Sequence, residues 1–198
     1  MRSDGLRLGA ACLITALAGC QTAPVSTPRA PGWEAHRAAL QARMHFELKG
    51  RVAVAAAGEG FNANLHWTQD GARSFVTLQG PLGVGGAQVT ADGADFSLVT
   101  SRGERLDSQA AHAALAARLG FDPPLAALRY WVLGVPDPQS PAAEALDAQT
   151  QRLSGLTQAG WHIDYTAYGA AGTDSLPTRL TLQRDTVRVR LLVDDWQL

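Results

Sequence analysis

The feature that most constrains this fold is a two-residue alternation of apolar and polar side chains that begins at Phe46. The apolar members of its first two segments are Phe46, Leu48, Val52, Val54, Phe61, Ala63, Leu65 and Trp67. Successive side chains of a β-strand point to opposite faces, so this period indicates strands with one buried face. Shorter apolar segments follow at 75–78, 88–90 and 96–100, with glycine-containing turns between the segments. Short strands joined by tight turns predict an antiparallel meander.

A helical region interrupts these strands. Ser108 and Gly120 are residue types of a helix N-cap and C-cap, and the segment between them is rich in alanine and leucine. This pattern predicts a helix over 109–119, capped by Ser108. Pro123-Pro124 predicts the start of a second helix, which ends near Gly134.

The last part of the chain returns to a two-residue period. We expect a loop at 135–147, because this segment is rich in proline and alanine. The strands predicted after it are 151–157, 161–167, 178–184 and 187–196. Strands, then helices, then strands predict a mainly β fold of the α+β type, with helices laid over a curved sheet.

The N-terminus has the features of an export signal. Arg2 and Arg7 precede an apolar run from Leu8 to Ala18, which is shorter than the ~20 residues that span a bilayer as a helix. The run ends in Leu17-Ala18-Gly19-Cys20, which resembles a bacterial lipobox. This resemblance implies cleavage before Cys20, with acyl chains on its sulfur and, after cleavage, on its amine. The alternative is a plain signal peptide with an incidental cysteine.

These features divide the chain into three parts. We expect a lipoprotein signal peptide at 1–19, a lipidated N-terminus and flexible tether at 20–32, and a single domain at 33–198. The tether is rich in proline and small polar residues, which cannot bury enough apolar surface to fold. The domain opens with apolar residues at helical spacing, which predicts a helix at 33–44.

Charge and cysteine content exclude several functions. Removal of 1–19 takes two arginines and one aspartate from a chain with 17 basic and 18 acidic residues, so the mature charge is about −2. Because a nucleic-acid partner favours a basic face, we expect no nucleic acid. Cys12 leaves with the signal and Cys20 carries lipid, so no thiol remains for a disulfide, a metal site or a nucleophile.

The sequence contains no recognisable catalytic motif. It has no Gly-x-Ser-x-Gly elbow, and its five histidines lack the spacing of a metal site. The glycine-rich segment 80–86 lacks the Lys-Ser/Thr of a phosphate loop. Asp194 and Asp195 are adjacent, and neighbouring strand residues point to opposite faces, so a shared carboxylate site is not expected. We therefore predict no enzyme, no metal and no cofactor beyond the acyl chains on Cys20.

What remains unusual in the sequence is apolar. A strongly curved sheet rich in Phe, Leu, Val and Trp can enclose a water-poor interior that holds acyl chains without directed polar groups. The candidate cavity residues are Leu65, Trp67, Leu78, Trp131 and Leu182. The alternative is that these large side chains form an ordinary core.

The segment 80–86 is the second unusual feature. Leu82 lies between Pro81 and Gly83, where turn geometry would direct its side chain outward. On a lipid-anchored protein, an exposed leucine could insert into a membrane. The alternative is a turn with Leu82 folded back onto the sheet.

Together these segments resemble the outer-membrane lipoprotein receptor family LolB over nearly the whole mature chain, 33–198. The segments that carry the resemblance are Phe46–Val54, Leu65–Trp67, Gly80–Gly83, Leu128–Pro136 and Gln158–Trp161. The implied fold is an unclosed antiparallel β-barrel, covered by helices around a hydrophobic cavity. This sequence departs from the family pattern at Gly80, because the family often has a polar residue before the Pro-Leu-Gly.

The resemblance also implies a function. A LolB-like protein accepts lipoproteins from the periplasmic carrier LolA and releases them into the inner leaflet of the outer membrane, without a nucleotide. It implies that Pro81, Leu82 and Gly83 form a membrane-insertion loop. We expect a monomer that is anchored by lipid in the outer membrane of a Gram-negative bacterium and faces the periplasm. The resemblance to sorted lipoproteins implies that Gln21, a residue other than aspartate after the lipidated cysteine, permits transfer to the outer membrane. The alternatives are a lipid-anchored structural or assembly subunit, or a LolA-like carrier, which the lipobox disfavours.

Overall fold

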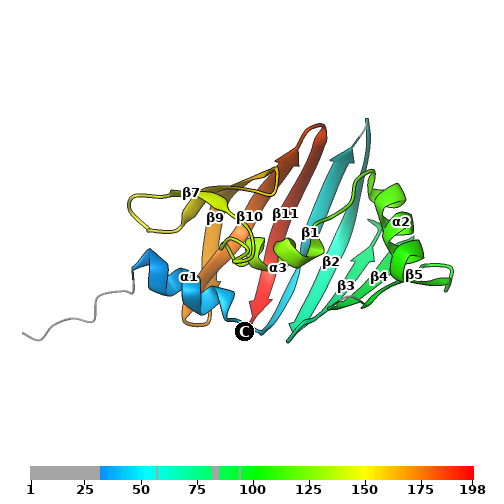
Figure 1. Cartoon of the computed structure of the whole chain (residues 1–198), viewed down its shortest axis with the longest axis horizontal. Helices are drawn as coiled ribbons and strands as arrows, with labels where there is room; N and C mark the ends of the chain where they lie inside the picture. Colours follow the sequence, from blue (N-terminus) through cyan, green and yellow to red (C-terminus); the bar gives the residue numbers. More distant parts are fainter. Residues whose placement is uncertain (1–31, 57, 82–84, 94) are drawn as a thin grey trace, which may run out of the picture. The chain divides into compact units, whose positions relative to one another are not determined.

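In the computed structural model, the first and last strands of the chain are neighbours at the centre of a single antiparallel sheet (Figure 1). The structure describes residues 32–56, 58–81, 85–93 and 95–198, and residues 31–198 form one compact unit. The lipobox with Cys20, the signal peptide, the tether up to residue 31, and Leu82 and Gly83 lie outside the described residues. No described helix is long and apolar enough to cross a membrane.

Eleven strands form the sheet, in the order β6-β5-β4-β3-β2-β1-β11-β10-β9-β8-β7. The first meander consists of β1 (His45–Ala56), β2 (Glu59–Asp70), β3 (Arg73–Gln79), β4 (Gly86–Asp92), β5 (Asp95–Thr100) and β6 (Arg105–Asp107). The second consists of β7 (Ala142–Leu146), β8 (Leu153–Gln158), β9 (Trp161–Ala171), β10 (Asp174–Arg184) and β11 (Val187–Gln197). Because β6 and β7 are edges that do not pair, the sheet stays unclosed, which confirms the predicted fold class.

The pairing of β1 with β11 joins the two meanders. Its register shifts between Lys49 and Gly50, since Lys49 faces Asp195 whereas Gly50 faces Val193. A Cβ atom on Gly50 would lie 2.1 Å from the carbonyl oxygen of Leu192. Only glycine therefore permits this close approach of the two backbones.

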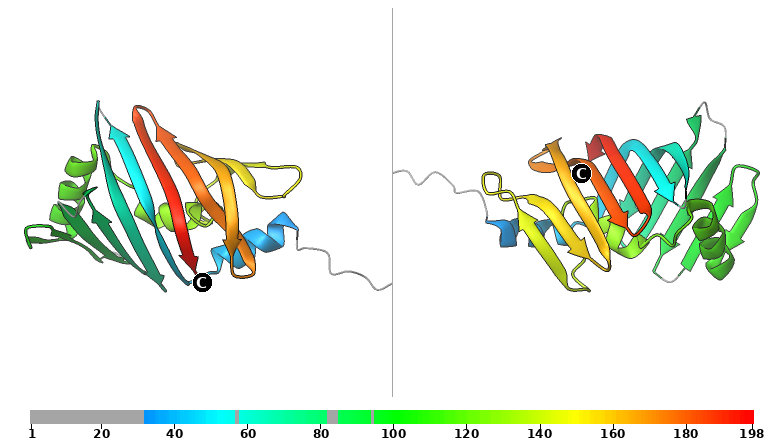
Figure 2. Two further views of the ribbon diagram at one scale, coloured as in Figure 1. Left: turned by 180° about the vertical axis from the view of Figure 1, so that it is seen from behind. Right: turned by 90° about the horizontal axis from the view of Figure 1, so that it is seen from above.

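Three helices lie on one face of the sheet (Figures 1 and 2). They are α1 (Trp33–Gln41), α2 (Ser108–Leu119) and α3 (Leu125–Trp131). The chain from β6 to β7 must cross the whole sheet from one edge to the other, and α2 and α3 form within this connection. The helices therefore cover the face that carries the buried side chains.

The predicted helix ends are partly corrected. Gly120 ends α2 in the left-handed conformation, with φ of 77°, as its residue type indicates. Ser108 is not the N-cap: it is the first residue of α2, and Asp107 precedes it in an extended conformation without a side-chain capping bond. Strand β6 ends at Asp107, and α2 therefore begins at the next residue, without a connecting turn.

The predicted loop at 135–147 is wrong in its second half. Residues Ala142–Leu146 form β7, the edge strand that pairs with β8. Alanine and glutamate have low strand propensity, so the sequence of β7 does not indicate a strand. Hydrogen bonding to the neighbouring strand, which is a tertiary contact, decides its structure.

Candidate functional site

An apolar cavity of about 130 Å³ lies between the sheet and the helices α2 and α3. On the sheet side, its walls include Val54, Leu65, Trp67, Leu78, Val89, Trp161, Leu182 and Val189. On the helix side, they include Leu115, Leu119, Phe121, Leu125, Leu128 and Val132. All of its lining residues are Val, Leu, Phe, Trp or Pro. The described residues that line the cavity therefore offer no charged group, and their only polar side-chain groups are the indole N–H groups of Trp67 and Trp161.

Strand alternation produces the sheet side of this cavity. Leu65 pairs with Leu78 across β2 and β3, and Leu182 pairs with Val189 across β10 and β11. Partners in an antiparallel pair project to the same face. The inward positions of neighbouring strands therefore form a continuous apolar surface beneath the helices.

Two hydrophobic clusters contribute to the wall of the cavity. The larger cluster includes Leu65, Trp161 and Leu182 and spans most of the sheet. The smaller one packs Leu115 and Ala111 of α2 against β4 and β5, with Val89, Phe96 and Leu98 as its sheet members. Residues from both clusters line the cavity, so it lies where the two cores meet.

Four of the five candidate cavity residues, Leu65, Trp67, Leu78 and Leu182, lie together on its wall. The fifth, Trp131, is fully buried and does not line it. Leu125, Leu128 and Val132 share the cavity face of the α3 turn, whereas Trp131 lies on the flank of the helix and packs against Trp161 with a ring-centre distance of 6.4 Å.

Trp161 was not among the candidates, although it lines the cavity. Its place at the start of β9, in alternation with Ile163 and Tyr165, marks it as inward-facing. The Phe121 and Trp161 rings form an edge-to-face pair with their centres 5.5 Å apart, and the Arg184 guanidinium lies 4.6 Å from the centre of the Trp161 ring. The alternation could have identified it; the contacts of Phe121 and Arg184 depend on the tertiary structure.

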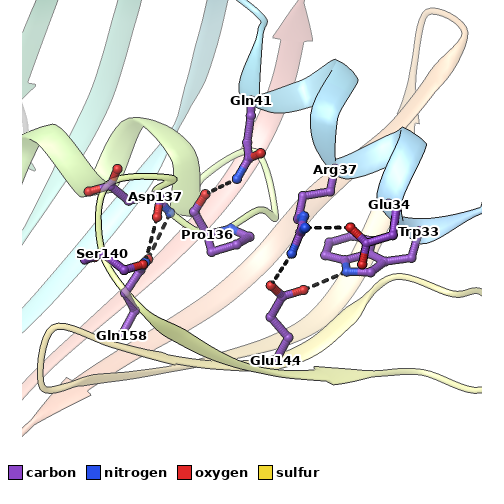
Figure 3. A network of polar contacts seen from close by, with 9 residues as sticks. All are labelled: Trp33, Glu34, Arg37, Gln41, Pro136, Asp137, Ser140, Glu144 and Gln158. Atoms are coloured by element: carbon purple, nitrogen blue, oxygen red, sulfur yellow. Dashed lines mark hydrogen bonds and ion pairs between the residues drawn. The ribbon is translucent and has the colours of Figure 1, made fainter.

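Gln158 is a buried polar residue that fixes α3 and the segment after it. Its side-chain oxygen accepts from Trp131 Nε1 at 2.7 Å and from the Asp137 backbone N–H at 2.9 Å. Its amide nitrogen donates to the carbonyls of Asp137 and Ser140, both at 2.8 Å (Figure 3). Gln158 thus makes four hydrogen bonds. Through them it holds α3 and the following segment, which belong to the crossover from β6 to β7, against β8.

Helix α1 is fastened to the edge strand β7. Trp33 Nε1 and Arg37 Nη1 donate to the two carboxylate oxygens of Glu144, at 2.6 and 2.7 Å (Figure 3). Gln41 Nε2 donates to the Pro136 carbonyl at 2.8 Å. These contacts fix the first element of the domain and also cover an edge strand, which limits pairing with other chains.

Two buried tyrosines support the same region. Tyr165 donates to the Trp131 carbonyl at 2.9 Å, and Tyr168 donates to the Leu153 carbonyl at 2.8 Å. Burial raises the pKa of both phenols well above its ordinary value. Both hydroxyls therefore stay protonated and act as structural donors.

The described part of the chain contains no group of three His, Cys, Asp or Glu side chains that could hold a metal ion. Among the exposed histidines, His66 pairs with Glu47 at 2.9 Å and His162 with Asp164 at 3.1 Å, whereas His112 stacks on the Phe96 ring. Asp194 pairs with Arg51 at 2.9 Å on the outer face of the sheet. These pairs lie outside the cavity.

Of the predicted membrane-insertion loop, Pro81, Leu82 and Gly83, only Pro81 falls within the described residues, and it is exposed. Leu82 and Gly83 lie outside them.

An unclosed antiparallel sheet whose helices cover an apolar cavity defines the fold class of this chain. A DUF1329 family protein from Desulfovibrio piger has this fold, with a TM-score of 0.58, 8% identity, and coverage of 83% of this chain and 90% of that one. A LolA superfamily protein from Nitrosomonas europaea has a TM-score of 0.52 and 10% identity, with coverage of 85% and 94%. These similarities concern the fold alone.

Sequence comparison identifies the family. The family model "Outer membrane lipoprotein LolB" matches residues 44–196, and the chain belongs to this family. An outer-membrane lipoprotein LolB of Nitrosococcus oceani is 33% identical over 186 residues, 92% of each chain. One of Stutzerimonas stutzeri is 31% identical over 193 residues, 95% of this chain and 93% of the relative. The resemblance found in the sequence is confirmed.

Proposed function

We propose that this protein accepts lipoproteins from a LolA-like periplasmic carrier and releases them into the inner leaflet of the outer membrane. The observation that carries the proposal is the wholly apolar cavity beneath α2 and α3 in a member of the LolB family. Acyl chains need no directed polar group, and each buried methylene contributes ~0.8 kcal/mol. This role requires no catalytic step.

The cavity must widen to hold an acyl chain. Its volume of about 130 Å³ is close to that of an engineered cavity of about 150 Å³ that binds benzene. An acyl chain is several times longer than a benzene ring. Leu115 and Leu119 of α2 and Leu125 and Leu128 of α3 form its helix side, so we expect both helices to shift away from the sheet when an acyl chain enters.

Transfer without a nucleotide must follow an affinity gradient. A ligand moves from the carrier to the receptor only as far as the receptor binds it more tightly. We therefore expect this cavity to bind acyl chains more tightly than the carrier does.

The proposal extends to the N-terminus and to the loop after Gly80. Signal peptide 1–19 is removed, Cys20 is acylated, and 20–32 tethers the domain 33–198, which works as a monomer. Two or more acyl chains make a stable anchor. Insertion of Leu82 would contribute ~1.5–3 kcal/mol, which is enough for transient membrane contact and too little for anchoring.

The cavity is tested by filling it. Leu78→Trp places an indole at a lining position, and Thr77→Trp places the same side chain on the opposite face of β3. Loss of two buried methylenes already weakens binding about tenfold. A fluorescent acylated peptide should therefore bind Leu78→Trp at least about tenfold more weakly than Thr77→Trp. Equal binding to both variants would exclude this cavity, and no acyl binding by the parent chain would favour a structural or assembly subunit.

The loop is tested separately with Leu82→Glu. The variant should accept a lipoprotein from the carrier as the parent does and deliver less of it to membranes. Gln79→Glu adds the same charge at an exposed position near the loop and should leave delivery unchanged. Undiminished delivery by Leu82→Glu would contradict the role of the loop.

A further inference from the structure

The outer face of the sheet, which the helices leave uncovered, carries a groove of about 880 Å³. The left panel of Figure 2, in which the molecule is seen from behind, shows this face toward the viewer, with β1, β10 and β11 at its centre. Three arginines line the groove: Arg51 on β1, Arg179 on β10 and Arg190 on β11. The strand register places them together, because Leu192 pairs with Arg51 on one side and with Arg179 on the other.

A fourth arginine extends this group along β11. Arg188 alternates with Arg190 on the outer face, and both are exposed. Arg51 pairs with Asp194 at 2.9 Å, whereas Arg179, Arg188 and Arg190 form no ion pair with any described residue. Positive charge is thus concentrated here in a chain whose mature charge is about −2.

The other lining residues of the groove are uncharged. They include the small Ala53, Asn62, Asn64 and Thr181, and also Leu192, which lies between Arg51 and Arg179. Arg51, Arg179 and Arg190 are exposed, so their guanidinium groups are accessible to a ligand. Guanidinium is planar and binds phosphate oxygens through two parallel N–H donors.

Two features place this groove beside the membrane-facing parts of the proposed receptor. Pro81, where the proposed insertion loop begins, is one of the residues that line the groove. Val189 lies between Arg188 and Arg190 in the sequence and lines the apolar cavity on the opposite face. The arginines therefore lie on the same half of the strands as the cavity.

We propose that Arg51, Arg179, Arg188 and Arg190 form a binding surface for the phosphate-bearing headgroups of anionic phospholipids. This inference rests on the proposed function, since it requires that the protein work at a bilayer. The outer face would lie against the headgroups while the loop after Pro81 enters the bilayer. The presence of Pro81, after which the proposed insertion loop follows, among the lining residues of the groove favours a lipid surface over an acidic protein partner.

The test uses the mature chain, residues 20–198, with Cys20→Ala so that no lipid anchors it. Sedimentation measures its binding to vesicles of phosphatidylcholine, alone or mixed with phosphatidylglycerol. Each arginine near an anionic surface contributes about fivefold in binding. Arg179→Gln with Arg190→Gln should therefore weaken binding to the mixed vesicles about 25-fold.

The control has the same change of net charge at another site. Arg102→Gln with Arg105→Gln removes two exposed arginines on and beside β6, and should change binding less than twofold. The effect of the groove pair should vanish on pure phosphatidylcholine. It should also shrink toward 1 M salt, where the screening length is about 3 Å.

Equal loss in the two double variants would show that only net charge matters and would overturn the proposal. Unchanged vesicle binding by the groove variant would also overturn it, even if that variant lost contact with an acidic protein. Binding of the acylated peptide is measured in parallel. If all variants bind the acylated peptide and their vesicle binding does not depend on the lipid headgroup, this inference fails and the proposed function stands. If the parent chain binds no acylated peptide, the proposed function fails.

Discussion

Replacement of Gln158 by leucine tests how the cavity cover is held. Gln158→Leu keeps the approximate size of the side chain, so the substitution leaves little empty space. It removes all four hydrogen bonds that join β8 to Trp131, Asp137 and Ser140. The effect therefore measures polar contacts rather than packing.

The expected loss is worked out from the burial of each partner. Trp131 is fully buried, so its indole N–H cannot reach water and costs about 1–3 kcal/mol when left without an acceptor. The Asp137 and Ser140 backbone groups are half-buried, and each bond to them contributes about 0.5 kcal/mol, the low end of the usual range. Since burial of leucine offsets part of this loss, we expect about 2–3 kcal/mol of destabilisation.

Urea unfolding followed by tryptophan fluorescence measures this loss, because Trp131 and Trp161 lie beside the substitution. With a slope of about 2 kcal/mol per molar urea, the midpoint should fall by roughly 1–1.5 M. Gln88→Leu is the matched control on the exposed side of β4 and should change the stability by at most about 0.5 kcal/mol. A loss below about 1 kcal/mol for Gln158→Leu would refute the reasoning, since the crossover would then be held without Gln158.

Two further predictions concern the backbone and pH. Gly50→Ala should lower the free energy of unfolding by about 3 kcal/mol or more, because the new Cβ would meet the Leu192 carbonyl. Gly32→Ala is the control: no atom lies within 4 Å of its new Cβ, so its stability in thermal unfolding should not change. An equal effect of the two substitutions would contradict the close approach at Gly50. Burial, and then the charge of Arg152, lower the pKa of His36, so the unfolded chain takes up a proton more readily and stability should fall as the pH drops below about 6.5. A His36 titration midpoint above that value in NMR would contradict this, and His36→Gln should remove its share of the pH dependence.

The sequence predicted most of the secondary structure because the periodicity is local. The alternation at Phe46–Val54 and Phe61–Trp67 identified β1 and β2 and also which side chains face inward. The same rule placed Leu65 and Leu182 on the cavity wall. It missed β7, whose alanines carry no strand signal and which forms by pairing with β8.

The cavity needed the tertiary structure. Trp131 was selected as a lining residue, but its orientation depends on Gln158, which accepts its indole N–H from a distant strand. Nothing in the residues around Gln158 indicates that it binds a loop from another part of the chain. The grouping of Arg51 with Arg179 and Arg190 likewise exists only because β1 and β10 both pair with β11.

The sequence by itself determined most of the strands, the approximate extent of the helices, the inward faces of the strands and the family, since these follow from local periodicity and from motifs in order. The tertiary structure decided that the first and last strands meet at the centre of the sheet and that the β6–β7 crossover lies over its apolar face. The physical reason is that these arrangements depend on contacts between segments far apart in the chain. Strand alternation states which side of a strand is apolar, and only packing determines whether that side meets a core or a cavity.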